Sequence, residues 1–181
     1  MTLNYSLSEQ DFLQFHLFTA SKTKRVQKSR KVSWLLFTGL FLVVGLLNLG
    51  DDNLFSKYYW FVVAIAFFFL FPIYHGYKLK KAYSKFVKDT YKNRIGERCE
   101  MEINQDTIAM KDVSGSCDLN LDQLEGITET AQYIFVKVKS GVSVVMAKQQ
   151  IDEVEKLITL LKEIAKERGV DYTVELNWKW K

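Results

Sequence analysis

Cysteine and histidine are scarce in this chain, with two of each among 181 residues. Cys99 and Cys117 form no CxxC pair, and His16 and His75 stand alone in the sequence. A zinc site needs clustered ligands, and a disulfide framework needs several cysteine pairs. We therefore expect no metal, no cofactor and no disulfide scaffold, and we expect both cysteines to be buried thiols that face inward.

Motifs for common enzyme chemistry are also missing. The sequence contains no Walker phosphate-binding loop, no GxGxxG fingerprint and no serine nucleophile elbow. Asp51 and Asp52 form an acidic pair, but a pair in a short loop is most often part of a turn. We expect that the protein is not an enzyme. A membrane enzyme whose site no motif reveals is the catalytic alternative.

Charged residues are absent from two long apolar segments, residues 32–49 and 58–77. In a helix the first would extend about 27 Å, close to the roughly 30 Å of a bilayer's hydrocarbon core. Both segments are apolar on every side, whereas buried helices of soluble proteins are usually amphipathic, and no signal-peptide cleavage pattern follows the first. The pattern predicts a transmembrane helical hairpin, and its uncharged interior argues against a transport pathway.

Positive charge flanks the hairpin on one side. The joining segment, residues 51–57, is too short for a domain, so the helices must be antiparallel, with both chain ends on the cytoplasmic side where Lys and Arg collect. The residues expected at the membrane interface are Lys22, Lys24, Arg25, Lys28, Arg30, Lys31, Lys78, Lys80, Lys81, Lys85, Trp34 and Trp60. Because the cations adjoin apolar segments, we expect the lipid bilayer and its anionic headgroups as their partners, and not nucleic acid.

Three further features concern the helices. The four residues from Ser8 resemble a capping sequence, which predicts a helix that runs from about Ser8 to the membrane. Pro72 should kink the second membrane helix, and Gly39 and Gly45 could allow close helix approach. Residues 80–91 continue as a lysine-rich helix with an apolar stripe, which either is solvated or lies on the inner leaflet.

The second part of the chain has the pattern of a β-rich domain. Alternating or continuous apolar residues predict short strands over residues 101–103, 108–110, 117–121, 134–138 and 142–147. Residues 151–165 then follow a helical period, and Gly169 is a natural helix stop. The predicted fold class is therefore an α+β membrane protein: a two-helix transmembrane hairpin plus a small antiparallel β barrel or sandwich capped by a C-terminal helix.

Both chain ends also alternate like strands. Apolar residues recur at every second position over residues 3–7 and 172–180. We expect the two end strands either to join the sheet or to pair with each other. In the alternative, Trp178 and Trp180 enter the membrane interface.

In this order the segments resemble the YcxB-like family, bacterial two-helix membrane proteins of unknown biochemical function. The resemblance rests on residues 5–12, the hairpin, and residues 101–110, 119–135 and 142–150. It implies a pleckstrin-homology-like (PH-like) fold for residues 98–169 and a location in the bacterial cytoplasmic (inner) membrane. It supplies no catalytic residues. Two departures are the absence of proline before the C-terminal helix and the tail over residues 170–180.

The expected organisation has five parts. They are an N-terminal strand and basic juxtamembrane helix (1–31), the hairpin (32–77), a second basic juxtamembrane helix (78–97), the PH-like domain (98–169) and a C-terminal strand (170–181). Residues 1–98 carry a net charge of +9 and residues 99–181 a net charge of −5.

Two functions fit this organisation. In the first, the hairpin anchors a cytoplasmic interaction or sensing module whose acidic domain binds a protein, since anionic headgroups need clustered cations. In the second, a small envelope, immunity or stress protein acts as a homo-oligomer through its transmembrane segments.

Overall fold

The computed structural model describes all residues except Asp51, Val142 and Lys181, so these three positions of the predicted loop, apolar run and C-terminal strand lie outside the described residues. The chain forms two compact units. The β-rich unit comprises Met1–Phe15 and Ser84–Lys179, and the helical unit comprises His16–Tyr83 with Trp180. The boundaries differ from the five expected parts, because the N-terminal strand and the start of the first helix belong to the β-rich unit.

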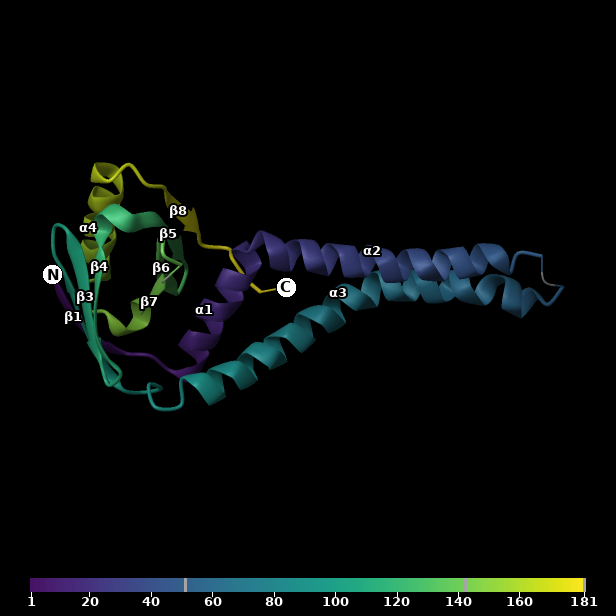
Figure 1. Cartoon of the computed structure of the whole chain (residues 1–181), viewed down its shortest axis with the longest axis horizontal. Helices are drawn as coiled ribbons and strands as arrows, with labels where there is room; N and C mark the ends of the chain where they lie inside the picture. The colour runs from purple at the N-terminus through teal and green to yellow at the C-terminus, as the bar shows by residue number, and fades with distance from the viewer. Residues whose placement is uncertain (51, 142, 181) are drawn as a thin grey trace. The chain divides into compact units, whose positions relative to one another are not determined.

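The fold class is α+β, as predicted (Figure 1). In chain order the elements are β1 Thr2–Ser6, α1 Glu9–Lys22, α2 Lys24–Leu47, α3 Leu54–Thr90, β2 Arg98–Ile103, β3 Thr107–Asp112, β4 Gly115–Asn120, β5 Leu124–Thr130, β6 Tyr133–Val138, β7 Ser143–Ala147, α4 Val154–Glu167 and β8 Tyr172–Glu175. Short 3₁₀ turns precede β5 and α4.

The strands form two open sheets, with orders β1-β2-β3-β4 and β7-β6-β5-β8. Neighbours are antiparallel except for β5 and β8, which run parallel. Neither sheet closes into a barrel over the residues that the structure describes. The predicted barrel alternative is therefore not formed.

The core of the β-rich unit combines one side of α4 with the inward positions of the strands. Leu157 and Leu161 of α4 are fully buried, as are Ile108 of β3 and Ile134 of β6. This pattern follows from the predicted periods, because apolar residues every second position in strands and every third or fourth in a helix give each element one face to bury. Gly169, with a φ of 64°, ends the helical segment as predicted.

Strand β5 was not recognised from its sequence. Its register against β6 shifts between Leu124 and Gly126, where a bulge or irregularity interrupts the ladder. A bulge moves later side chains to the opposite face, so the period of two on which strand prediction depends is lost.

Both end strands join a sheet, which confirms the first of the expectations for them. β1 pairs with β2, and Leu3 and Tyr5 point into the core. β8 pairs with β5 in the other sheet and ends at Glu175, earlier than predicted. The two end strands therefore do not pair with each other.

A largely buried ion pair, between the buried Glu129 and the half-buried Lys148, accompanies the attachment of β8. The Lys148 ammonium lies 2.6 Å from one carboxylate oxygen of Glu129, and the Tyr172 hydroxyl donates to the other oxygen at 2.6 Å. Burial alone would raise the pKa of Glu129, but the hydrogen bonds from Lys148 and Tyr172 outweigh it and lower that pKa below 4.5. The carboxylate of Glu129 thus connects β5, β8 and the residue after β7.

Replacing Glu129 by Gln should lower the free energy of unfolding of the β-rich unit by about 1–3 kcal/mol at neutral pH, because it removes a buried charge-assisted pair. A carboxylate whose pKa is lowered on folding stabilises the fold above its unfolded pKa and loses this effect as pH falls. The difference between wild type and E129Q should therefore shrink below about pH 4.5. Urea unfolding of the full chain across pH measures it.

Glu125→Gln is the matched control, because Glu125 lies on the same strand and pairs with Lys137 at 2.5 Å with both side chains about half exposed. Its cost should stay within about 1 kcal/mol. Equal costs for the two variants at neutral pH would contradict the assigned role of the buried pair.

Helix α1 begins with the predicted cap. The Ser8 amide donates to an Asp11 carboxylate oxygen at 2.8 Å, and the Asp11 amide donates to the Ser8 hydroxyl at 3.3 Å. This reciprocal pattern is a capping box. The other oxygen of Asp11 accepts from the Tyr133 hydroxyl at 2.8 Å, which ties the start of α1 to β6.

The prediction of one continuous helix from Ser8 to the membrane is wrong. Thr23 has an extended backbone, with ψ of 111°, and separates α1 from α2. The Thr23 hydroxyl donates to the Thr19 carbonyl at 2.8 Å, so a side chain satisfies a carbonyl in the last turn of α1. Helix α2 starts at Lys24 and includes all the predicted basic residues before the apolar segment except Lys22.

Candidate membrane interface

Helices α2 and α3 lie side by side from the loop that joins them (Figure 1) and carry most of the exposed apolar surface of the helical unit. Both are long and apolar enough to cross a membrane by length and composition, and only 11% and 6% of their most apolar windows are buried. Leu47 is 79% exposed and Leu54 is 74% exposed. Soluble monomers rarely expose such continuous apolar surface, so these helices do not serve as the buried core of this chain.

All the predicted interface residues except Trp60 collect at one end of this helix pair. Lys22 ends α1, and the other cations that precede the apolar segment lie in the first turns of α2. Lys78, Lys80, Lys81 and Lys85 lie on α3 after its apolar segment, Lys85 on the part assigned to the β-rich unit. Their side chains are exposed, except that of Arg30, which is half-buried.

Trp60 lies near the opposite end of the pair. Its ring is 6.3 Å from that of Phe41 and nearly parallel to it. The helices are therefore antiparallel, because a residue late in α2 meets one early in α3.

Close packing in the hairpin depends on one of the two predicted glycines. A Cβ on Gly45 would lie 3.1 Å from the Phe61 ring, so this glycine makes room for an aromatic side chain. A Cβ on Gly39 would meet no atom within 4 Å, so that position is not part of this contact. The remaining contacts join aromatic rings, such as Phe37 with Phe67 and Phe41 with Phe67.

Trp34 compensates for the proline in α3. Pro72 has no amide hydrogen, so the carbonyl of Phe68, four residues earlier, loses its helical hydrogen bond. The Trp34 indole donates to this Phe68 carbonyl at 3.0 Å, and its ring lies 4.5 Å from that of Phe68. The role expected for Trp34 was an interfacial aromatic, and this hydrogen bond could not be foreseen without the pairing of the helices.

Replacing Trp34 by Phe should destabilise the helix pair by about 0.6–1.7 kcal/mol, from the average to the maximum found for hydrogen bonds between membrane helices. In a Pro72→Ala background the cost should be smaller, because the alanine supplies its own amide to the Phe68 carbonyl. Wild type, the two single variants and the double variant form a double-mutant cycle. Equilibrium unfolding of the four full-length chains in mixed micelles of mild detergent and dodecyl sulfate measures it.

Trp60→Phe serves as the control for loss of an indole, and its cost should be the same whether Pro72 is kept or replaced. An equal cost of Trp34→Phe in both backgrounds would show that the carbonyl of Phe68 is not what Trp34 stabilises.

A cleft of about 340 Å³ opens between α2 and α3 at their basic ends. Its lining residues are Gln27, Arg30, Lys31 and Trp34 from α2 and Phe71, Pro72 and His75 from α3. The positions on α2 follow a spacing of three and four, so they share one side of the helix. The Nδ1 atom of His75 is buried and has no hydrogen-bond partner among the residues that the structure describes.

Trp180 lies against the same end of the helical unit. Its indole donates to the Gly76 carbonyl at 3.2 Å, and the Arg30 guanidinium is centred 5.3 Å from its ring. Stacking of this kind is a cation–π interaction. The indole is therefore satisfied within the chain, whereas the sequence alone allowed only a strand or a membrane contact for this residue.

The β-rich unit contains a second cavity, of about 290 Å³. Tyr5, Arg94, Cys99, Asp112, Cys117 and Val145 are among its lining residues, and Arg94 forms an ion pair with Asp112. Burial raises the pKa of the Cys99 thiol, which disfavours the reactive thiolate. The prediction of a buried Cys117 is wrong, since this residue is exposed on edge strand β4, where only Leu119 is buried.

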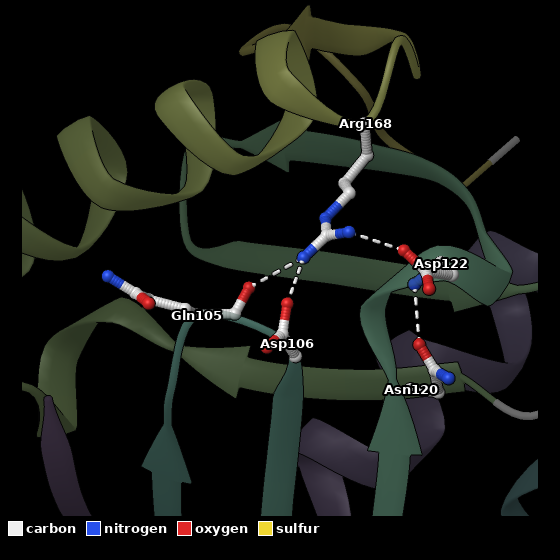
Figure 2. Close-up of polar contacts among 5 residues, drawn as sticks. All are labelled: Gln105, Asp106, Asn120, Asp122 and Arg168. Atoms are coloured by element: carbon white, nitrogen blue, oxygen red, sulfur yellow. Dashed lines mark hydrogen bonds and ion pairs between the residues drawn. The ribbon is translucent and has the colours of Figure 1, made fainter.

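A cluster of charged residues surrounds Arg168 (Figure 2). Its guanidinium bonds to the carboxylates of Asp106 and Asp122 and to the Gln105 carbonyl. Asn120 caps the turn that carries Asp122, accepting from the Asp122 amide at 2.7 Å. The cluster joins the end of α4 to the β2–β3 turn and to the segment after β4. We therefore interpret its role as stabilisation of the fold.

The described residues contain no group of three or more His, Cys, Asp or Glu side chains placed to hold a metal ion. No family model, curated protein or solved structure matches the chain.

The class of protein is defined by the fold alone. It is an α+β protein with two open, largely antiparallel sheets and two helices long and apolar enough to cross a membrane.

Proposed function

We propose that this protein is a membrane-anchored interaction or sensing module, with both chain ends on the cytoplasmic side of a bacterial inner membrane. The observation that carries the proposal is the contrast between the two units. The helical unit exposes apolar side chains along two helices and, with Lys181 counted, has 11 Lys and Arg against 2 Asp and Glu, a net +9. The β-rich unit is a compact fold with 14 Lys and Arg against 19 Asp and Glu, a net −5.

A PH-like, YcxB-like identity for the β-rich unit is part of this proposal. Two antiparallel-rich sheets followed by an amphipathic helix, α4, support it. Strands β1 and β8 would then be additions at one edge of each sheet.

The partner of the β-rich unit is proposed to be a protein. Its net negative charge disfavours anionic lipid as its main ligand. The edge strand β4 pairs only with β3 among the described strands, and its first four residues, Gly115 to Asp118, are exposed. An exposed edge with unpaired backbone groups can accept an extended peptide as a further strand.

One observation favours the second function, oligomerisation through the helices. Gly39 lies on α2 with open space where its Cβ would be, although Gly45 is used inside the hairpin. A small residue on an outer helix surface allows a second helix to approach closely. Crosslinking in native membranes distinguishes the two functions: a distinct soluble partner supports the first, and self-association alone supports the second.

Labelling with a membrane-impermeant thiol reagent tests the topology. Gly50→Cys, in a chain whose native cysteines are replaced by Ser, should react in intact spheroplasts, because a side chain at Gly50 meets no atom within 4 Å. The wild-type chain, labelled in a parallel sample, is the control, because its exposed Cys117 should react only after permeabilisation. The reverse pattern would overturn the orientation, and labelling of both positions in intact spheroplasts would overturn the anchor.

A further inference from the structure

The cleft between α2 and α3 has two chemically different parts. Arg30, Lys31 and Gln27 provide positive charge and an amide, whereas Trp34, Phe71 and Pro72 provide apolar surface. In sequence this is the point where the uncharged segments end, since Lys31 directly precedes residue 32 and Lys78 directly follows residue 77. In a bilayer, such a boundary faces the headgroup region.

We propose that this cleft binds one acidic phospholipid, with Arg30 and Lys31 on its phosphate and Trp34 and Phe71 beside the first part of its acyl chains. The inference deepens the proposed function and rests on its membrane anchor. It replaces a diffuse attraction to juxtamembrane lysines with a defined site.

Three observations select this occupant. The cleft volume of about 340 Å³ lies within the roughly 300–1,000 Å³ range of small-ligand sites. The two cations complement a phosphate, and basic pockets between membrane helices on the cytoplasmic side bind anionic headgroups. His75 also lines the cleft and adds a polar ring to it, and its Nδ1 atom has no hydrogen-bond partner among the described residues.

The contact of Trp180 with Arg30 is compatible with this role. A cation–π contact leaves the positive charge of the guanidinium in place, so Arg30 still complements a phosphate electrostatically.

The test uses the full chain in nanodiscs of equal phosphatidylcholine and phosphatidylglycerol, with retained lipids counted by native mass spectrometry. Wild type should retain one phosphatidylglycerol in preference to phosphatidylcholine. The double variant Arg30→Gln, Lys31→Gln should lose this preference at least roughly fivefold. The matched control, Arg25→Gln with Lys28→Gln, removes the same charge from α2 outside the cleft and should keep it.

Equal losses in the two double variants would show diffuse attraction and overturn the site. Displacement of the retained lipid by soluble glycerol phosphate would also overturn it, because the apolar wall would then contribute nothing. Flotation of the wild-type chain with liposomes is measured first, so that a chain that does not enter bilayers refutes the proposed function. A chain that floats without a phosphatidylglycerol preference refutes only this inference.

Discussion

Replacing Leu40 by Arg should release the chain from membranes under alkaline extraction. Leu40 lies near the centre of the apolar segment of α2 and is 55% exposed. An Arg at the centre of a membrane helix costs about 2.5–3.5 kcal/mol, which shifts an insertion equilibrium about a hundredfold. The measurement is the fraction of full-length chain that remains in the membrane pellet after carbonate washing.

Val113→Arg is the control, because Val113 lies in the turn between β3 and β4, is 56% exposed, and gains the same side chain. This variant should stay in the pellet with wild type. If Leu40→Arg were retained as fully as Val113→Arg, the exposed surface of α2 would have to face something other than lipid.

Replacing Leu161 by Ala should lower the free energy of unfolding of the β-rich unit by about 2–5 kcal/mol. Leu161 is fully buried on the apolar side of α4. The truncation removes apolar contacts and leaves a cavity that a packed core fills only in part. Pulse proteolysis of the full chain in mild detergent across a urea series measures the shift of the unfolding midpoint.

Leu176→Ala provides the comparison, since Leu176 is 54% exposed just beyond β8. Its effect should stay within about 0.5 kcal/mol. A midpoint shift as small for Leu161→Ala as for Leu176→Ala would mean that α4 does not complete the core.

Features that depend on neighbours in the chain were predictable. The capping box at Ser8 needs only residues three apart, and it forms as expected. The apolar side of α4 and the alternation in β2 also follow from local periods, whereas β6 buries Phe135 together with Ile134 and Val136. The break at Thr23 was missed because a lysine-rich helix start carries no proline or glycine that would mark it.

Features that depend on distant partners were not predictable. The two end strands were expected to be strands, but their separate sheets follow from pairing across more than 40 residues in each case. The exposure of Cys117 follows from the position of β4 at a sheet edge, which its own alternation does not encode. The buried Glu129–Lys148 pair likewise needs β5 and the end of β7 to meet.

The sequence by itself determined that two uncharged apolar segments are flanked by cations and followed by an acidic β-rich part, because composition and period are local quantities. The tertiary structure decided how these segments are used. It placed Trp34 on the carbonyl that Pro72 leaves without a partner and opened a cleft beside Arg30 and Lys31. Both arise only when α2 packs antiparallel to α3, since a hydrogen bond or a cavity between helices depends on which residues face each other.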